Sequence, residues 1–254
     1  MVAAFDASSI IGTDGGALIA RSGDAGREMN RPKALLSWSS GKDSAWALHS
    51  LRRQGTHEIV GMVTTVNERA RRVAMHAVRE ELLEAQAHAA GLALWRVPIP
   101  SPCSDSQYEA AMREVVRRAQ SEGVSAMAFG DLFLADIRAY RERQLAGTGI
   151  APLFPLWLQP TGVLAGDMIA AGTRAVLTCV DPRHLPSSFA GREFDAELLR
   201  DLPSRVDPCG ENGEFHTFAY AGPMFCEAIS IVVGAVSERD GFVFADVHDG
   251  AAQL

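Results

Sequence analysis

The residues best suited to chemistry in this chain form one polar turn, Ser39-Ser40-Gly41-Lys42-Asp43-Ser44. The turn lies between an apolar run (LLSW) and the start of an amphipathic helix (AWAL), which predicts a strand-to-helix connection. The first N–H groups of such a helix point outward, and the helix dipole favours an anion there. Serine hydroxyls, a lysine ammonium and a glycine that lets the backbone approach closely complete a predicted phosphate-binding site.

Two known patterns can be compared with this turn. Walker A places Gly where this chain has Leu36, and Ser or Thr where it has Asp43, so that pattern does not fit. The turn resembles instead the S-G-G-x-D-S loop of PP-loop ATP pyrophosphatases, with Ser40 in place of the first Gly. The alternative is a simple helix cap, in which Asp43 or Ser44 only starts the helix.

A second polar cluster lies in the C-terminal half, Asp207-Pro208-Cys209-Gly210-Glu211-Asn212-Gly213-Glu214-Phe215-His216-Thr217. Its Pro, Gly and Asn content predicts a loop. Three carboxylates, a thiol, an imidazole and a hydroxyl within eleven residues are candidates for acid–base or binding roles. The alternative is a solvated acidic turn that enters a strand at Phe215.

A third cluster follows the fourth predicted strand. Gly130-Asp131 lies at the carboxyl end of that strand, where ligands of parallel sheets collect. Arg138 and Glu142 are four residues apart and would share a helix face. Their alternative role is an intrahelical ion pair, and we expect nothing more of Arg141 and Arg143.

The elements that must position these residues alternate along the chain. Candidate strands cover 33–38, 59–66, 92–97 and 124–129, and apolar stripes between them predict helices. One stripe contains Met75, Val78, Leu82, Ala85 and Ala89; another begins at the capping box formed by Ser104 and Gln107. Strands that are apolar on both faces indicate a buried parallel sheet. The fold class is therefore α/β, a doubly wound parallel sheet of Rossmann-like type over residues 32–150.

A smaller α+β subdomain is predicted over 151–254. It would contain a helix over 162–171, a strand over 174–180, a loop-rich stretch over 182–223, and two β runs over 229–236 and 242–247 joined by a hairpin turn. Residues 1–31 show no periodicity and are predicted to be a disordered tail.

Composition limits the partners. The formal net charge is −7 with a pI near 5.5, which argues against a nucleic-acid partner. No apolar stretch approaches the roughly 20 residues of a membrane span, and the N-terminus does not resemble a secretory signal. The four cysteines are scattered and we expect reduced thiols in a cytoplasmic protein. A homodimer is one assembly left open.

In their order, the turn, the Gly-Asp pair, the R-x-x-x-E pair and the G-E-N-G-E loop resemble the diphthine–ammonia ligase family of PP-loop ATPases over residues 32–225. The resemblance implies ATP and Mg²⁺ as cofactors, and a carboxylate-bearing small molecule or protein together with ammonia as substrates. It implies attack of that carboxylate on the α-phosphate, release of pyrophosphate, and displacement of AMP by ammonia. A tRNA sulfurtransferase using Cys209 and a non-catalytic ATP-binding module are the alternatives.

Roles follow from this resemblance. The nucleotide would contact the six residues of the turn and Asp131, with Asp43 as Mg²⁺ ligand. We expect the side chains of Lys42 and Asp43 to face ligand or solvent, and Lys42, Asp43, Glu211 and Glu214 to be catalytic. The substrate would contact residues of the second and third clusters, namely Arg138, Glu142, Glu211, Asn212, Glu214 and His216.

Overall fold

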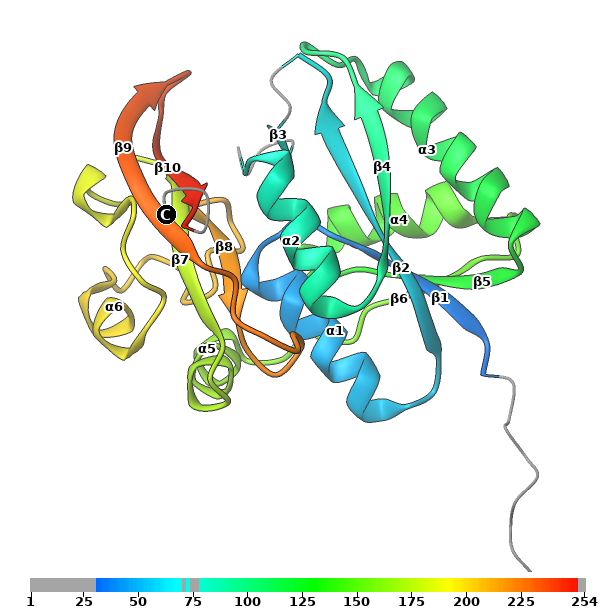
Figure 1. The fold of residues 1–254 in the computed structure, drawn as a ribbon, viewed down its shortest axis with the longest axis horizontal. Coiled ribbons are helices and arrows are strands. Elements are labelled where there is room, and N and C mark those ends of the chain that lie inside the picture. The colour runs from blue at the N-terminus through cyan, green and yellow to red at the C-terminus, as the bar shows by residue number, and fades with distance from the viewer. Residues whose placement is uncertain (1–30, 70–71, 74–77, 251–254) are drawn as a thin grey trace, which may run out of the picture. The chain divides into compact units, whose positions relative to one another are not determined.

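Five parallel strands carry the polar turn and confirm the predicted doubly wound architecture. The computed structural model of the chain describes residues 31–69, 72–73 and 78–250. Sheet A has the strand order β4 (Ala93–Ile99), β2 (Glu58–Asn67), β1 (Lys33–Ser37), β5 (Val124–Ala128) and β6 (Ala151–Leu153) (Figure 1). A short antiparallel strand, β3 (Arg72–Val73), also pairs with β2.

Helices cover both faces of sheet A. They are α1 (Lys42–Gln54), α2 (Glu80–Ala90), α3 (Asp105–Ser121) and α4 (Ala135–Leu145). Because successive side chains of a strand point to opposite faces, the neighbours Leu35 and Leu36 belong to different cores. Leu36 packs in the core that includes α1 and α2, and Leu35 packs in the core that includes α3.

The chain order of these strands creates a switch point between β1 and β5. The chain moves outward from β1 to β2 and β4, and then returns through α3 to place β5 on the other side of β1. Ligands of doubly wound sheets bind at the carboxyl ends of the two strands that flank such a point. Here those ends carry the polar turn after β1 and the Gly130-Asp131 pair after β5.

Two details of sheet A differ from the sequence prediction. The apolar stripe from Met75 to Ala89 does not belong to one helix: α2 begins at Glu80, the buried Val78 precedes it, and Met75 lies outside the described residues. Strand β6 was not expected, because Pro152 was taken to break the chain. It lies at an edge of sheet A, where a missing N–H is tolerated.

The C-terminal part of the described chain builds a second, antiparallel sheet. Sheet B has the order β8 (Phe215–Ala221), β7 (Arg174–Val180), β10 (Phe242–Asp249) and β9 (Ile231–Arg239). The predicted hairpin is confirmed, since β9 and β10 are joined by Asp240 and Gly241, both with positive φ. Helix α5 (Thr161–Ala170) and β7 agree with the predicted helix and strand.

The loop-rich stretch predicted over 182–223 is partly wrong. It contains α6 (Ala196–Asp201), the short 3₁₀ helix Ser187–Phe189 and strand β8. Strand β8 escaped the prediction because its residues FHTFAYA follow directly on the turn-rich loop. The strand is stabilised by long-range pairing with β7, which no local pattern indicates.

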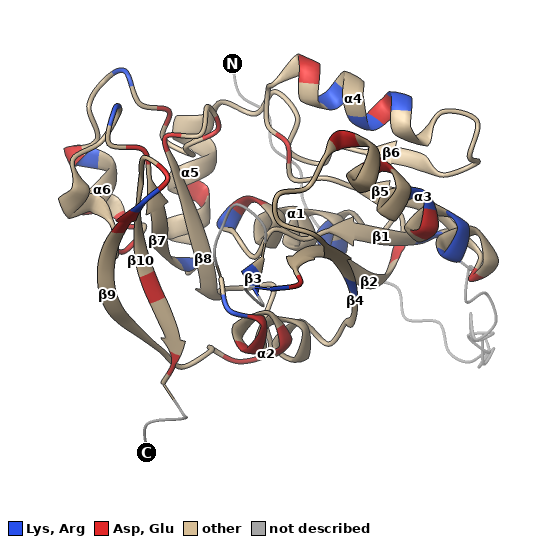
Figure 2. Cartoon of the chain, turned by 90° about the horizontal axis from the view of Figure 1, so that it is seen from above, with Lys and Arg blue, Asp and Glu red and all other residues tan. Residues whose placement is uncertain are grey.

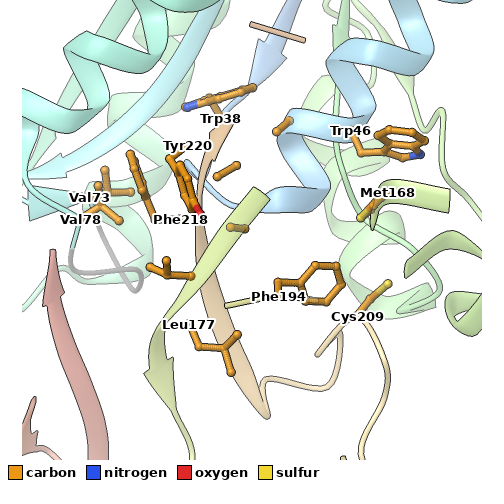
Figure 3. Close-up of a cluster of buried hydrophobic side chains, with 14 of the residues drawn as sticks. Trp38, Trp46, Val73, Val78, Met168, Leu177, Phe194, Cys209, Phe218 and Tyr220 are labelled. Atoms are coloured by element: carbon orange, nitrogen blue, oxygen red, sulfur yellow. The ribbon is translucent and has the colours of Figure 1, made fainter. Parts of the chain in front are cut away.

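One hydrophobic core runs from sheet A into sheet B. It includes Leu36 and Trp46 from the N-terminal part, and Leu177, Phe218 and Val243 from sheet B. Figure 3 shows side chains of this core, including Trp38 beyond β1 with Leu177 and Phe218. The chain from Arg31 onward forms one compact unit, and the predicted boundary near residue 150 stays a prediction. The predicted tail, 1–31, lies outside the described residues except for Arg31.

Candidate functional site

The backbone of the polar turn is held in a left-handed conformation at Ser40. Its φ is 68°, a value that Gly adopts without strain and that costs an L-residue about 1–2 kcal/mol. The Ser40 carbonyl accepts hydrogen bonds from the backbone N–H of Ala219 at 3.0 Å and from Nε2 of Gln86 at 2.9 Å. Gln86 is fully buried and in turn accepts a hydrogen bond from Nε1 of Trp38 at 2.8 Å. Strand β8 and helix α2 therefore hold the turn from two sides.

Lys42 does not face solvent, which was one of the two alternatives that the sequence left open for it. The residue is 1% exposed, and its ammonium lies 5.2 Å and 5.3 Å from the ring centroids of Phe194 and Phe215. Its Nζ donates to Oδ2 of Asp43 at 2.9 Å and to the backbone carbonyl of Cys209. Burial has the largest single effect and lowers the pKa of Lys42, but the nearby acidic groups, Asp43 first among them, and the hydrogen bond to Asp43 together outweigh it, so the pKa is raised on balance. Lys42 therefore stays charged and ties α1 to the acidic loop.

The acidic loop is organised by two of its own carboxylates. Glu214 is 1% exposed and accepts hydrogen bonds from the backbone N–H of Asp207, the backbone N–H of Asn212 and the Asn212 side-chain amide, each at 3.0 Å. Asp207 Oδ1 accepts from the N–H groups of Cys209 at 2.9 Å and Glu211 at 3.2 Å. Glu214 and Asn212 were expected to contact substrate. Their observed bonds are to each other and to the loop backbone, so they shape the loop.

Gly210 is required at the tightest point of this loop. It has a φ of 73°, and a Cβ at this position would lie 2.9 Å from both the ring and the carbonyl oxygen of Phe215. Phe215 is the first residue of β8 and contacts the Lys42 ammonium. The close packing of Gly210 on Phe215 thus fixes the position of Glu211, the residue that follows Gly210.

Glu211 reaches across to the other half of the site. Its Oε1 accepts a hydrogen bond from the backbone N–H of Leu132 at 2.8 Å, in the segment that follows β5. Burial raises the pKa of Glu211 to about 7, and the charges of Asp43 and Asp131 act in the same direction, whereas the Leu132 N–H opposes them. A carboxylate with this pKa can exchange a proton near neutral pH.

The end of β5 packs directly on the start of α1. A Cβ on Gly130 would lie 3.0 Å from the backbone of both Asp43 and Ser44, so a larger residue would require the start of α1 to shift. Next to it, Oδ2 of Asp131 lies 3.7 Å from Nε of Arg141 on α4. Both atoms are buried and have no hydrogen-bond partner among the described residues. Burial raises the pKa of Asp131, although the Arg141 charge opposes the shift.

These groups line a polar cavity of about 260 Å³. Its lining residues from the turn are Ser39, Lys42, Asp43 and Ser44, and those from the end of β5 are Gly130 and Asp131. The lining also includes Arg141, Glu211, His216 and Thr217. The buried Ser40 and the cap residue Gly41 support the turn from behind and are not among the lining residues. The structure thus brings together residues from all three clusters that the sequence singled out.

A larger cavity of about 600 Å³ opens beside the polar one and shares Ser37, Ser39, Arg141 and His216 with it. Its other lining residues come mainly from the carboxyl ends of β1, β2 and β4 and from α3, and they are largely apolar, among them Trp38, Val63, Ile99 and Met112. Burial lowers the pKa of His216 to about 4, with a smaller contribution from the Lys42 charge. The imidazole between the two cavities is therefore neutral at pH 7.

Two predicted substrate contacts are not part of either cavity. Arg138 Nε and Glu142 Oε1 form the alternative ion pair at 2.8 Å, and their side chains are 35% and 46% exposed. The guanidinium of Arg138 stacks on the rings of Phe154 and Trp157, each at 4.7 Å. In Figure 2, red acidic and blue basic segments alternate along the ribbon of α4. The side chains of this pair therefore cover the surface outside the site.

Two residues that matter here, Gln86 and Arg141, could not be recognised from the local sequence. Gln86 lies in the middle of α2 and looks like an ordinary polar helix residue, and only the burial of its face would have indicated a role. Arg141 was interpreted as a surface charge, although it lines both cavities. Arg141 lies on α4 beside Asp131, which follows β5. This placement depends on how α4 packs against sheet A, and the local sequence pattern does not contain that information.

Comparison with known proteins agrees with this geometry. Residues 32–151 match the diphthamide synthase N-terminal domain, and residues 161–246 match the diphthamide synthase C-terminal domain. The chain belongs to this family. A diphthine–ammonia ligase from Danio rerio is 29% identical over 227 residues, which cover 76% of this chain and 84% of the relative. The first match includes the polar turn and Asp131, and the second includes the whole acidic loop.

Two absences can be stated for the described residues alone. None of their helices is long and apolar enough to cross a membrane. No group of three or more His, Cys, Asp or Glu side chains in that part of the chain is arranged to hold a metal ion.

Proposed function

We propose that this protein is an ATP-dependent amide-forming ligase that adenylates a substrate carboxylate, releases pyrophosphate and transfers ammonia to the acyl group. The observation that carries the proposal is the convergence of the turn, Asp131 and Glu211 on one polar cavity. Glu211 bridges to the N–H of Leu132, so the acidic loop closes the site over the start of α1. The name of the Danio rerio relative supports ligation with ammonia.

The two adjoining cavities match the two halves of ATP. The larger one is mostly apolar and suits a nucleoside, and the polar one at the start of α1 suits phosphates. The side-chain hydroxyls of Ser39 and Ser44 are 3.2 Å apart and both line the polar cavity. The α-phosphate would then lie close to the shared lining residues Ser39, Arg141 and His216.

The charges in the polar cavity favour a phosphate that carries Mg²⁺. Three carboxylates, from Asp43, Asp131 and Glu211, face two cations, Lys42 and Arg141. A bare triphosphate would be repelled by such a set, whereas Mg²⁺ uses one or two carboxylates together with phosphate oxygens. Asp43 and Asp131 are the residues that would hold the ion, which would neutralise charge on the phosphates.

The reaction needs only steps that these residues can support. A carboxylate oxygen of the substrate attacks the α-phosphorus and the bond to the β-phosphate oxygen breaks, so pyrophosphate leaves. Ammonia nitrogen then attacks the acyl carbon, AMP leaves with the acyl C–O electron pair, and one ammonia proton must be removed. Glu211, with its pKa near 7, is the base that we assign to this proton. Lys42 acts indirectly, by holding Asp43 and the acidic loop in place.

The state of Cys209 disfavours the sulfurtransferase alternative. Cys209 is 2% exposed, and its Sγ donates to the carbonyl of Thr161 at 3.5 Å. Burial raises the pKa of this thiol to about 12, so little thiolate exists at neutral pH. A catalytic thiol needs the opposite shift and some exposure.

The first experiment incubates the protein with ATP, Mg²⁺, ammonium and a panel of carboxylic acids, and measures AMP and pyrophosphate. Acid-dependent formation of both in equal amounts supports the proposal. Formation of ADP, or bound ATP without turnover of any acid in the panel, contradicts it.

Glu211→Gln separates ATP binding from transfer. We expect ATP affinity to stay within about two-fold of wild type, since an uncharged side chain keeps the Leu132 contact, while amide formation falls by about 10²-fold or more. At a constant concentration of free ammonia, amide formation by the wild type should rise as the pH increases through about 7, and this dependence should vanish in the variant. If the variant instead needs much more Mg²⁺ to bind ATP, Glu211 is a metal ligand and not the base. Glu214→Gln is the matched comparison, expected to destabilise the loop because its carboxylate accepts bonds from Asp207 and Asn212.

A further inference from the structure

Arg141 lies where three cavities meet. Besides the two already described, a third cavity of about 310 Å³ lies between α3 and α4, and Arg141 lines all three. Tyr108 and Met112 line both this cavity and the large apolar one, and Phe129 lines both this cavity and the polar one. The third cavity therefore adjoins the polar cavity at the side chains of Arg141 and Phe129.

The guanidinium of Arg141 is held in place, but not all of its N–H donors are used in hydrogen bonds. Its plane packs over the Phe129 ring at 5.0 Å, and Nη1 donates to the Tyr108 hydroxyl at a long 3.4 Å. Its Nε is buried, lies 3.7 Å from Asp131 Oδ2, and has no hydrogen-bond partner among the described residues. A positioned guanidinium with donors to spare matches a planar carboxylate, because its fork can donate two parallel hydrogen bonds.

The third cavity is apolar in its interior and basic at its rim. Side chains of Met112, Val116, Met127, Phe129 and Leu145 provide the apolar lining. Arg113 and Arg117 also line it, with side chains 64% and 71% exposed; they pair with Glu109 and Glu114, and neither of these glutamates is among the lining residues. This combination suits an uncharged apolar group attached to an anion, and it disfavours a cationic one.

We propose that this third cavity binds the acyl substrate, as a small carboxylic acid with an apolar body whose carboxylate is held by Arg141. The inference rests on the proposed function, and it names the substrate class. With the body between α3 and α4, the carboxylate would point past Phe129 to the polar cavity, where the α-phosphate is expected. Arg141 is then the residue that selects a carboxylate and orients it for attack.

The probe is 3-phenylpropionate, with binding measured by calorimetry on the full chain saturated with α,β-methylene-ATP and Mg²⁺. Wild type is expected to bind the acid and not 3-phenylpropanamide. Arg141→Lys should weaken binding by about ten-fold or more, because a lysine cannot form the bidentate pair. Arg143→Lys is the matched control: this arginine is exposed on the same helix and lines none of the three cavities, so binding should be unchanged.

Val116→Trp tests the cavity itself, since Val116 lines it and is only partly buried. We expect the acid to be excluded while affinity for the ATP analogue stays within two-fold. Val116→Phe serves the same purpose if the larger variant fails to fold. The inference is overturned if wild type does not bind the acid, if either filling variant binds it normally, or if filling the cavity weakens the nucleotide instead.

The two proposals fail in different ways. If the ATP analogue does not bind, the proposed function fails, and acid binding without nucleotide still decides the role of the third cavity. A different outcome is that ATP is converted to AMP with other acids while 3-phenylpropionate binds equally well to the wild type and to the Arg141 and Val116 variants. In that case the ligase assignment stands and this inference is wrong.

Discussion

Replacing Lys42 with methionine removes a buried ammonium while keeping a flexible apolar side chain of similar length. In the native protein this ammonium bonds to Asp43 Oδ2 at 2.9 Å and to the Cys209 carbonyl, and it packs between two phenyl rings. Methionine would keep the apolar packing of the stem, and it would lose the polar bonds to Asp43 and Cys209 together with the ammonium–ring contacts. The variant therefore measures what the charge contributes to the fold, separately from the packing of the stem.

The loss of stability in Lys42→Met depends on the groups that lose their partner, namely the Asp43 carboxylate and the Cys209 carbonyl. Breaking a buried ion pair by removing one partner costs about 3–5 kcal/mol, because the other charge is left uncompensated. Asp43 keeps 25% of its side chain exposed, so water can solvate it in part. The Cys209 carbonyl loses a charged donor as well. We expect a loss of roughly 2–4 kcal/mol in the free energy of unfolding.

Urea denaturation followed by tryptophan fluorescence measures this loss, with an expected fall of about 1 M in the midpoint and little change in slope. The double variant Lys42→Met with Asp43→Asn should regain part of the stability, because no charge is then left unpaired. A Lys42→Met protein as stable as the wild type would refute the reasoning: it would mean that the ammonium lies in solvent or awaits a ligand, as the sequence alone suggested.

Three further variants test local features of the site by thermal or urea denaturation. Ser40→Gly should stabilise by roughly 0.5–1 kcal/mol, since glycine removes the strain of a φ of 68°; a destabilised variant would show that the serine is not strained. Gly210→Ala should cost about 2 kcal/mol or more, because the added Cβ clashes with Phe215. Gly213→Ala is the control: Gly213 also has a positive φ, but its added Cβ would have no neighbour within 4 Å, so it should cost only about 1 kcal/mol. Equal losses of stability in the two variants would contradict the clash. Asp246 pairs with Arg72 and Arg79, which hold its pKa at about 2 despite partial burial. Its contribution of about 1–2 kcal/mol to stability is therefore present at neutral pH and is lost as the pH falls from about 4 to 2. Asp246→Asn should be less stable than wild type at pH 7 and equal to it at pH 2, and a stability difference that stays constant with pH would argue against this origin.

The sequence by itself determined the elements whose cause is local. The capping box is present as predicted, with Ser104 Oγ accepting from the Gln107 N–H and the Gln107 side chain accepting from the Ser104 N–H. The parallel strands β1, β2, β4 and β5 are separated by the helices α1, α2 and α3, because apolar periodicity and glycine positions act within a few residues of each other. The polar turn follows from the same local rules, since a strand and a helix directly flank it.

Only the tertiary structure decided which side chains meet. Lys42 is buried because Phe194, Phe215 and the Cys209 carbonyl, more than 150 positions along the chain, enclose it. Arg141 belongs to the site and Arg138 does not, although both lie on α4 in sequences of similar polarity. Long-range packing makes these distinctions, and it depends on how whole elements fit together, so the spacing of residues along the chain does not contain it.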